Sequence, residues 1–176
     1  QARRVQTLVE NAFDAFFAKD NAKAASVLLL DDEIDRVDVD LERASVSLLS
    51  DATREGAHLD QIQLRHVLTI VKVNNELERI ADVGVAIAEA VSRLPSTMPT
   101  CPPTLRVMTN SVVGIVRDVG LAVDRTDARL AKVVLQSEDA VTAFKAALLR
   151  NAEEQIASGK MNVDFAFIVH ELATRC

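Results

Sequence analysis

Residues 27–48 read VLLLDDEIDRVDVDLERASVSL, and the spacing of their apolar side chains decides the fold class. These positions alternate steps of three and four residues: Val27, Leu30, Ile34, Val37, Leu41, Ala44 and Leu48. The alternation keeps one face of an α-helix apolar over several turns, and it is typical of helices that pack side by side at shallow angles. The stretch therefore predicts a long amphipathic helix inside a bundle. We call such an apolar stripe, spaced in steps of three and four along one helix face, a seam.

A second stretch, NNELERIADVGVAIAEA at residues 74–90, belongs to a seam of the same kind. Its apolar positions are Ile70, Val73, Leu77, Ile80, Gly84, Ile87, Val91 and Leu94. An earlier, shorter seam consists of Val5, Leu8, Ala12 and Phe16. No convincing strand is found anywhere, so the sequence predicts an all-α protein.

Local signals divide these seams into three helices. Asp20 and Asn21 are expected to separate the first helix from the second, and residues 51–60 the second from the third. Asp60 followed by Gln63 predicts a capping box at the start of the third helix.

All four prolines fall in LPSTMPTCPP at residues 94–103. Proline ends helices and stiffens linkers, so this segment is the clearest internal boundary. The sequence predicts a first unit over residues 1–94, a proline-rich linker over residues 95–103 and a second unit over residues 104–176. Thr104 is expected to cap the first helix of the second unit.

The second unit repeats the first at an offset of 107 residues. Residues 15–35 align with residues 122–142. The matched pairs are Asp20 with Asp127, Val27 with Val134 and Ile34 with Val141. We therefore expect two tandem three-helix units that form an elongated helical bundle. Glu78 lies 18 residues after Asp60, and the same count from the aligned Asp164 passes the last residue. The sixth helix, and with it the second unit, is therefore expected to be cut short at Cys176.

Two carboxylate pairs share an i, i+4 spacing: Asp31 with Asp35, and Glu78 with Asp82. On a helix each pair projects from one face, where like charges cost roughly 0.2–0.5 kcal/mol per pair. A cation held between two neighbouring helices would neutralise that repulsion. Carboxylate oxygens suit a hard or borderline metal ion, so these four residues are the candidate metal ligands.

An alternative interpretation leaves the four carboxylates as solvated charges beside the core. Each of Asp31, Asp35 and Glu78 comes one residue after a seam position, where solvated charges and interhelical ion pairs are common. The available cationic partners are Arg36, Arg43 and Arg79. Asp38 and Glu42 extend the acidic flank and are expected to be solvated.

Composition and sequence motifs argue against several classes of function. The chain has 176 residues, is 49% hydrophobic and carries a net charge of -6, which argues against a nucleic-acid partner. No run of 18 apolar residues and no signal peptide is present, so no membrane insertion of this segment is expected. Neither a nucleophile motif nor a glycine-rich phosphate loop occurs, so an enzyme is not expected.

The chain begins at Gln1 rather than Met, and we expect it to be part of a longer protein or to lack a disordered start.

The sequence resembles the PhoU family of phosphate-uptake regulators. The resemblance rests on residues 15–42, with the DxxID pattern of the family's second helix, and on ELERIADVGVAIAEA at residues 76–90. The family also carries two three-helix repeats. Ala86 departs from the family, which often has Asn there. Thr142 stands where an acid is expected, and the repeat-two ExxxD is absent, so at most one complete site is expected.

The resemblance implies a negative regulator of phosphate uptake in the cytoplasm, peripheral to or tethered at the inner membrane. It implies an adaptor between a phosphate ABC transporter and a sensor histidine kinase, with a homodimer as a further option. It also implies divalent or trivalent metal binding (Fe, Zn, Mn or Mg) by Asp31, Asp35, Glu78 and Asp82, the positions that match the family's E/DxxxD motifs.

Two alternatives stay open beside the adaptor. One is the cytosolic regulatory tail of a sodium–phosphate cotransporter, because PhoU-like domains also occur there. The other is a carboxylate-bridged di-metal oxidase, suggested by the ExxH spacing of Glu55 and His58. The second is remote, because Gly56 makes that segment read as a loop.

Overall fold

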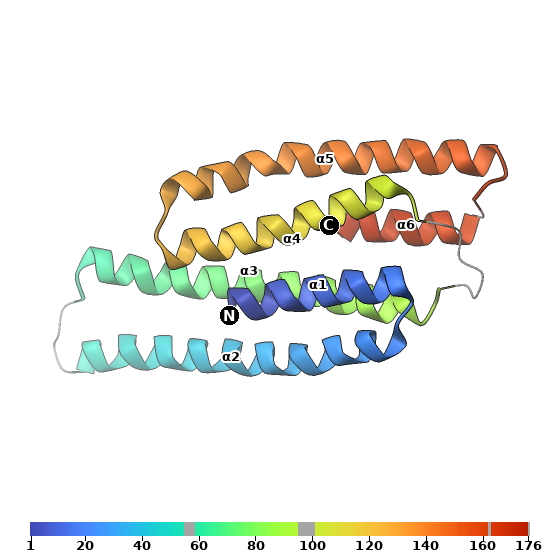
Figure 1. Cartoon of the computed structure of the whole chain (residues 1–176). Coiled ribbons are helices and arrows are strands. Elements are labelled where there is room, and N and C mark those ends of the chain that lie inside the picture. The colour runs from blue at the N-terminus through green and yellow to red at the C-terminus, as the bar shows by residue number, and fades with distance from the viewer. Residues whose placement is uncertain (55–58, 95–100, 162, 176) are drawn as a thin grey trace.

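The structure is a computed structural model that describes residues 1–54, 59–94, 101–161 and 163–175. The described residues form six helices and no strand, which confirms the all-α prediction (Figure 1). The helices are α1 (Ala2–Ala18), α2 (Asn21–Arg54), α3 (Gln61–Val91), α4 (Pro103–Asp124), α5 (Ala128–Ala157) and α6 (Val163–Arg175).

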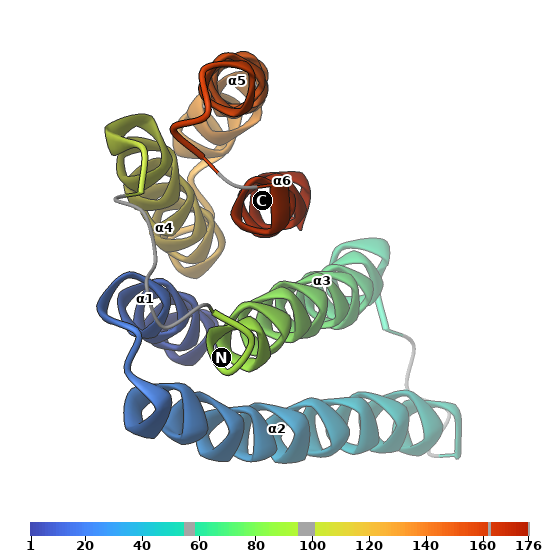
Figure 2. The ribbon, with the colours of Figure 1, turned by 90° about the vertical axis from the view of Figure 1, so that its right-hand side faces the viewer.

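The six helices lie nearly parallel or antiparallel to one another in an elongated bundle (Figure 1). Helices α1, α2 and α3 pack together, while α4 packs on α5 and α5 on α6. The view along the bundle shows α1 beside α4, and α6 above α3 (Figure 2). The main contact between the two groups is α1 on α4, with a smaller one between α3 and α6.

The turn between α1 and α2 is repeated between α4 and α5 at the predicted offset. Lys19 and Thr126 both adopt positive φ, of 54° and 51°. The amide of Asp20 donates to the Ala15 carbonyl at 2.9 Å, and the amide of Asp127 donates to the Ala122 carbonyl at 2.8 Å. These equal geometries at equivalent positions support the internal repeat that the sequence indicates.

Aspartates cap the helices that follow these turns. An Asp20 carboxylate oxygen accepts from the amide of Lys23 at 2.9 Å, and Asp127 accepts from the amides of Arg129 and Leu130 at 2.9 and 3.0 Å. Each cap satisfies amide donors that a helix start otherwise leaves unpaired.

Of three predicted helix boundaries, one is confirmed and two are misplaced. The capping box of Asp60 and Gln63 is present and opens α3. The expected N-cap at Thr104 is wrong, because α4 begins at Pro103 after Pro102. Proline suits the first helical position, where its missing amide costs no hydrogen bond. The break expected from residue 51 is also misplaced, because α2 continues to Arg54; residues 55–58 lie outside the described part of the chain.

The core is centred on α1, which packs against α2, α3 and α4. Its buried side chains are Val5, Leu8, Val9, Ala12, Phe13, Ala15 and Phe16. Gly84 brings α3 close to α1, since a Cβ there would lie 2.3 Å from Leu8 Cδ2. Phe17 on α1 contacts α4, where the guanidinium of Arg106 lies 4.1 Å from the centroid of the Phe17 ring.

The two long seams are buried over only part of their length. Val27 and Ile34 are fully buried, whereas Leu48 at the far end of α2 is 50% exposed and Ile70 on α3 is 47% exposed. Helix α1 has 17 residues and α2 has 34, so α1 cannot cover the outer half of the α2–α3 pair. The seams are therefore buried near α1 and exposed at their outer ends.

Candidate metal centre

Helices α2 and α3 run antiparallel, and one hydrogen bond fixes how they face each other (Figure 1). The side-chain amide of Asn74 on α3 donates to the Asp38 carboxylate on α2. In an antiparallel pair, residues earlier on α2 then face residues later on α3. Asp35 is thereby placed at the level of Glu78.

The next turn places Asp31 at the level of Asp82. On α3, Asn74, Glu78 and Asp82 follow one another in steps of four and share one helix face. The structure therefore brings all four candidate ligands to the same α2–α3 face. Asp31 and Glu78 are half-buried, and Asp35 and Asp82 are exposed.

We call the four carboxylates Asp31, Asp35, Glu78 and Asp82 the acidic face. Their charges interact, as the pKa shifts of two of them show. Burial, followed by repulsion from Asp35, Asp82 and Asp32, raises the pKa of Asp31 above its ordinary value. Burial, followed by repulsion from Asp82, Asp38, Asp35 and Asp31, raises the pKa of Glu78. Unshielded carboxylates at close quarters favour protonation in this way, or the capture of a cation.

The arginines expected as partners do not neutralise the acidic face. Arg79 pairs with Glu76 at 2.9 Å, and Arg43 lies 3.9 Å from Asp40. Within the described part of the chain, no Lys or Arg forms an ion pair with any member of the acidic face, Arg36 included. The interpretation of these acids as one side of interhelical salt bridges is therefore wrong.

The donor set fits a metal ion by its chemistry rather than by a preformed geometry. Four carboxylates supply the oxygen ligands that Mg²⁺, Mn²⁺ and iron accept. Across residues 1–54, 59–94, 101–161 and 163–175, no three His, Cys, Asp or Glu side chains are already arranged as ligands.

Asn74 is a member of this region that the sequence analysis missed, and the burial of Asp38 was not expected. Asp38 was expected to be solvated, but it is half-buried and accepts the hydrogen bond from Asn74. Asn74 is 5% exposed, and its Oδ1 has no partner in the structure. The available signal was the step of four from Asn74 to Glu78. Glu42 is exposed, as predicted.

The equivalent positions on α5 carry one acid where α2 carries two. Glu138 and Thr142 stand there, and both are exposed. His66 and His170 are also exposed, away from any ligand group among the described residues. Glu55 and His58, the ExxH pair, lie outside the described residues.

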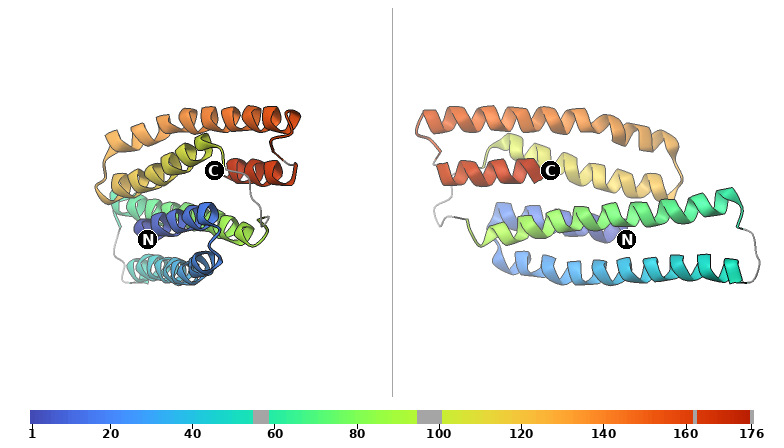
Figure 3. Two further views of the ribbon diagram at one scale, coloured as in Figure 1. Left: turned by 45° about the vertical axis from the view of Figure 1, so that its right-hand side comes forward. Right: turned by 180° about the vertical axis from the view of Figure 1, so that it is seen from behind.

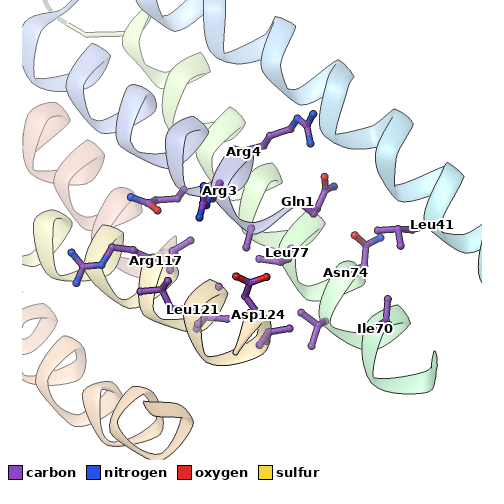
Figure 4. A pocket seen from close by; sticks show the side chains of 17 residues that line it. Gln1, Arg3, Arg4, Leu41, Ile70, Asn74, Leu77, Arg117, Leu121 and Asp124 are labelled. Carbon is purple, nitrogen blue, oxygen red and sulfur yellow. The ribbon is translucent and has the colours of Figure 1, made fainter. Parts of the chain in front are cut away.

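A pocket of about 470 Å³ lies where α1, α3 and α4 meet, beyond the acidic face (Figure 4). Leu77, Val116 and Leu121 are among its lining residues. The labelled guanidinium groups of Arg4 and Arg117 point in opposite directions and do not form a common anion site (Figure 4).

None of the helices in the described part of the chain is long and apolar enough to cross a membrane.

The chain is similar to known proteins both in its first unit and over most of its length. The PhoU domain model matches residues 1–91, which contain α1, α2 and α3. The "Phosphate-specific transport system accessory protein PhoU homolog" of Aquifex aeolicus (strain VF5) is 29% identical over 141 residues, which cover 80% of this chain and 62% of that protein. This chain thus spans less than two thirds of that relative.

A second relative matches almost the whole chain. The "Phosphate-specific transport system accessory protein PhoU homolog 1" of Thermotoga maritima (strain ATCC 43589 / DSM 3109 / JCM 10099 / NBRC 100826 / MSB8) is 26% identical over 166 residues. The match covers 93% of this chain and 69% of the relative.

Proposed function

Since the chain belongs to the PhoU domain family, we propose that it is an accessory protein of phosphate transport that restrains phosphate uptake by contact with other proteins. Two relatives carry names of phosphate-specific transport accessory proteins, and this supports the proposal. The same names favour an accessory protein over the cytosolic tail of a sodium–phosphate cotransporter.

The acidic face is the observation that carries the proposed mode of action. Four carboxylates share one face of two packed helices, repel one another and have no cationic partner among the described residues. This repulsion costs some stability, and a bound cation would relieve it. Asp31, Asp35, Glu78 and Asp82 would hold it.

A bound cation would supply charge neutralisation and a fixed α2–α3 geometry. The ordered helix pair would then present one defined surface to a partner, and this is the role of an adaptor rather than of an enzyme. We propose that the partners are a phosphate transporter and a sensor histidine kinase on the cytoplasmic side of the inner membrane. A homodimer is a compatible assembly.

A di-metal oxidase receives no support from the described residues. Such sites in helical bundles combine several carboxylates with histidines on inward faces. His66 and His170 are exposed and distant in sequence from the four acids. The adaptor is therefore the better proposal.

The test combines uptake and metal binding in one set of variants. A strain that lacks the gene should take up phosphate without restraint, and the native gene should restore the restraint. The variant Asp35→Asn with Asp82→Asn should fail to restore it, and the purified variant should bind Mn²⁺ or Mg²⁺ at least tenfold more weakly in calorimetry.

Glu138→Gln is the matched control, because Glu138 is an exposed acid at the position equivalent to Asp31 in the second unit. It should restore restraint and bind metal like the native chain. Normal restraint by the double variant would contradict the role of metal. Unchanged uptake in the deletion strain would contradict the regulatory function itself.

A further inference from the structure

Two buried side-chain oxygens have no hydrogen-bond partner among the described residues, Asn74 Oδ1 and Gln1 Oε1. Both residues line the pocket of about 470 Å³ between α1, α3 and α4. The view from behind in Figure 3 shows the end of α4 lying over the first half of α3, close to the start of α1. None of the four residues of the acidic face lines this pocket, so it is a separate place in the fold.

The hydrogen bond to Asp38 fixes the orientation of the Asn74 amide. An ionised carboxylate accepts hydrogen bonds and donates none, so the Nδ2 side of the amide faces Asp38 and donates to it. The Oδ1 side is then left as an acceptor in a side chain that is 5% exposed. A buried acceptor without a partner lowers the stability of the fold. Any group that satisfies Asn74 must therefore donate a hydrogen bond.

The walls of the pocket are largely aliphatic. Ile70, Val73 and Leu77 come from α3, and Val116, Val119 and Leu121 come from α4. Water would satisfy the two oxygens but would gain nothing from these walls. An apolar cavity with a few convergent polar groups is typical of a site for a small organic group.

The acceptor end of the pocket is negatively polarised. The Asp38 carboxylate binds the nitrogen of the Asn74 amide, and linked hydrogen bonds polarise one another, which strengthens Oδ1 as an acceptor. A second carboxylate, that of Asp124, points from α4 toward Leu77 (Figure 4). A donor that carries a positive charge therefore fits this end better than a neutral or an anionic one.

Three arginines also line the pocket, and all three are exposed: Arg3, Arg4 and Arg117. Arg117 forms an ion pair with Asp118 at 2.9 Å, which offsets its charge locally. The guanidinium of Arg4 is directed away from Asp124 (Figure 4). Exposed charges are screened by water and salt, whereas the buried amide oxygen acts at contact distance.

We propose that this pocket binds a primary aliphatic amine. Its ammonium group donates to Asn74 Oδ1, with Gln1 Oε1 as a further acceptor, and its hydrocarbon chain lies against the walls from α3 and α4. A free alkylamine and the lysine side chain of a partner protein share this chemistry. The inference is independent of metal binding and of the phosphate-uptake role.

The test compares three ligands that share a hexyl chain and differ in the head group: hexylamine, hexanol and hexanoate. Each is titrated into the full chain at neutral pH in a calorimeter. Hexanol should bind about threefold or more weakly than hexylamine, and hexanoate about tenfold or more weakly, because the hydroxyl donates without a charge and the carboxylate donates nothing.

Nuclear magnetic resonance locates the bound amine. The methyl resonances of Leu77 and Leu121, which line the pocket, should shift when hexylamine is added. Those of Leu135, which is 72% exposed on α5 and does not line the pocket, should stay in place.

Matched variants test the acceptor. Asn74→Leu should abolish the preference for hexylamine over hexanol, because it removes the amide oxygen and keeps a side chain of similar size. Asn75→Leu is the same substitution at the next residue, which is exposed and does not line the pocket, and it should bind like the native chain.

A second pair of variants tests the charge at exposed positions, where the fold is not at risk. Asp124→Asn should weaken hexylamine binding about threefold and leave hexanol binding unchanged. Asp139→Asn, an exposed acid on α5 outside the pocket, should change neither.

A further ligand separates the two sources of the amine. Nα-acetyl-lysine methylamide carries the same ammonium group on a peptide side chain. Binding as tight as that of hexylamine would assign the pocket to a lysine of a partner protein. Weaker binding would assign it to a free amine.

Three results would overturn the proposal. One is the absence of saturable hexylamine binding, which would leave the two oxygens to water. Another is equal affinity for hexylamine, hexanol and hexanoate. The third is unchanged preference for hexylamine in the Asn74→Leu variant, which would place the amine elsewhere.

Discussion

The two three-helix units share their turns but differ in how completely their cores are closed. Lys19 and Thr126 take the same positive φ, and Asp20 and Asp127 cap the next helix in the same way. Yet Ile34 is fully buried on α2, whereas its counterpart Val141 is half-buried on α5. Turn geometry is therefore set locally, while the burial of equivalent residues depends on how the surrounding helices pack.

The two units also differ at the positions of the acidic face. In the first unit α3 extends far enough to place Glu78 and Asp82 opposite Asp31 and Asp35. In the second unit, Glu138 matches Asp31 but Thr142 stands at the position of Asp35, so α5 carries one acid where α2 carries two. The units therefore differ in acid content as well as in burial.

The largest expected effect contrasts the two cores directly. Ile34→Ala should destabilise the chain by about 2–5 kcal/mol, because it leaves a cavity at a fully buried position. Val141→Ala should cost less than about 1 kcal/mol, because its side chain is only half-buried. Chemical denaturation measures both. Val27→Ala and Val134→Ala form a chemically identical second pair, and equal losses in either pair would break the comparison.

Metal should act on the first unit alone. A cation at 100-fold over its dissociation constant adds about 2.7 kcal/mol to the stability of the folded chain. We expect a rise of about 5–10 °C in the thermal midpoint with metal, and its loss with chelator. Asp35→Asn with Asp82→Asn should remove the response, and Glu138→Gln should keep it. Without metal, the double variant should be at least as stable as the native chain, because repulsion is relieved.

The turns should respond equally in both units. Asp20→Ala and Asp127→Ala each remove a helix cap and should cost about 1 kcal/mol. Thermal or urea unfolding of the two variants checks this. A loss in the first unit several times that in the second would mean that the turns are not equivalent after all.

The smallest effect concerns pH. The folded pKa values of Asp31 and Glu78 lie above the ordinary values of 3.8 and 4.5, with burial as the first cause and neighbouring carboxylates as the second. The folded chain therefore binds more protons than the unfolded chain just above those values, and this contribution makes stability fall as the pH rises through that window. Asp31→Asn should gain stability relative to the native chain as the pH increases from about 4 to 7 in low salt. Asp139→Asn, an exposed acid on α5, serves as the control, and a parallel gain there would point to net charge instead.

Periodicity and local signals in the sequence were enough to predict the all-α fold, the capping box at Asp60, the internal repeat and the four acidic candidates. These features depend on periodicity and on contacts within a few residues, which the order of residues specifies directly. It did not determine the helix start at Pro103, because proline both ends one helix and opens another.

Tertiary packing sets which parts of the seams are buried. Leu48 and Ile70 obey the same spacing as Ile34, but α1 is too short to reach them. It also decided that Asp38 bonds to Asn74 and that Arg79 pairs with Glu76 rather than with the acidic face. Burial and pairing depend on which helices lie opposite each other and how far they extend, and spacing along one helix does not contain that information.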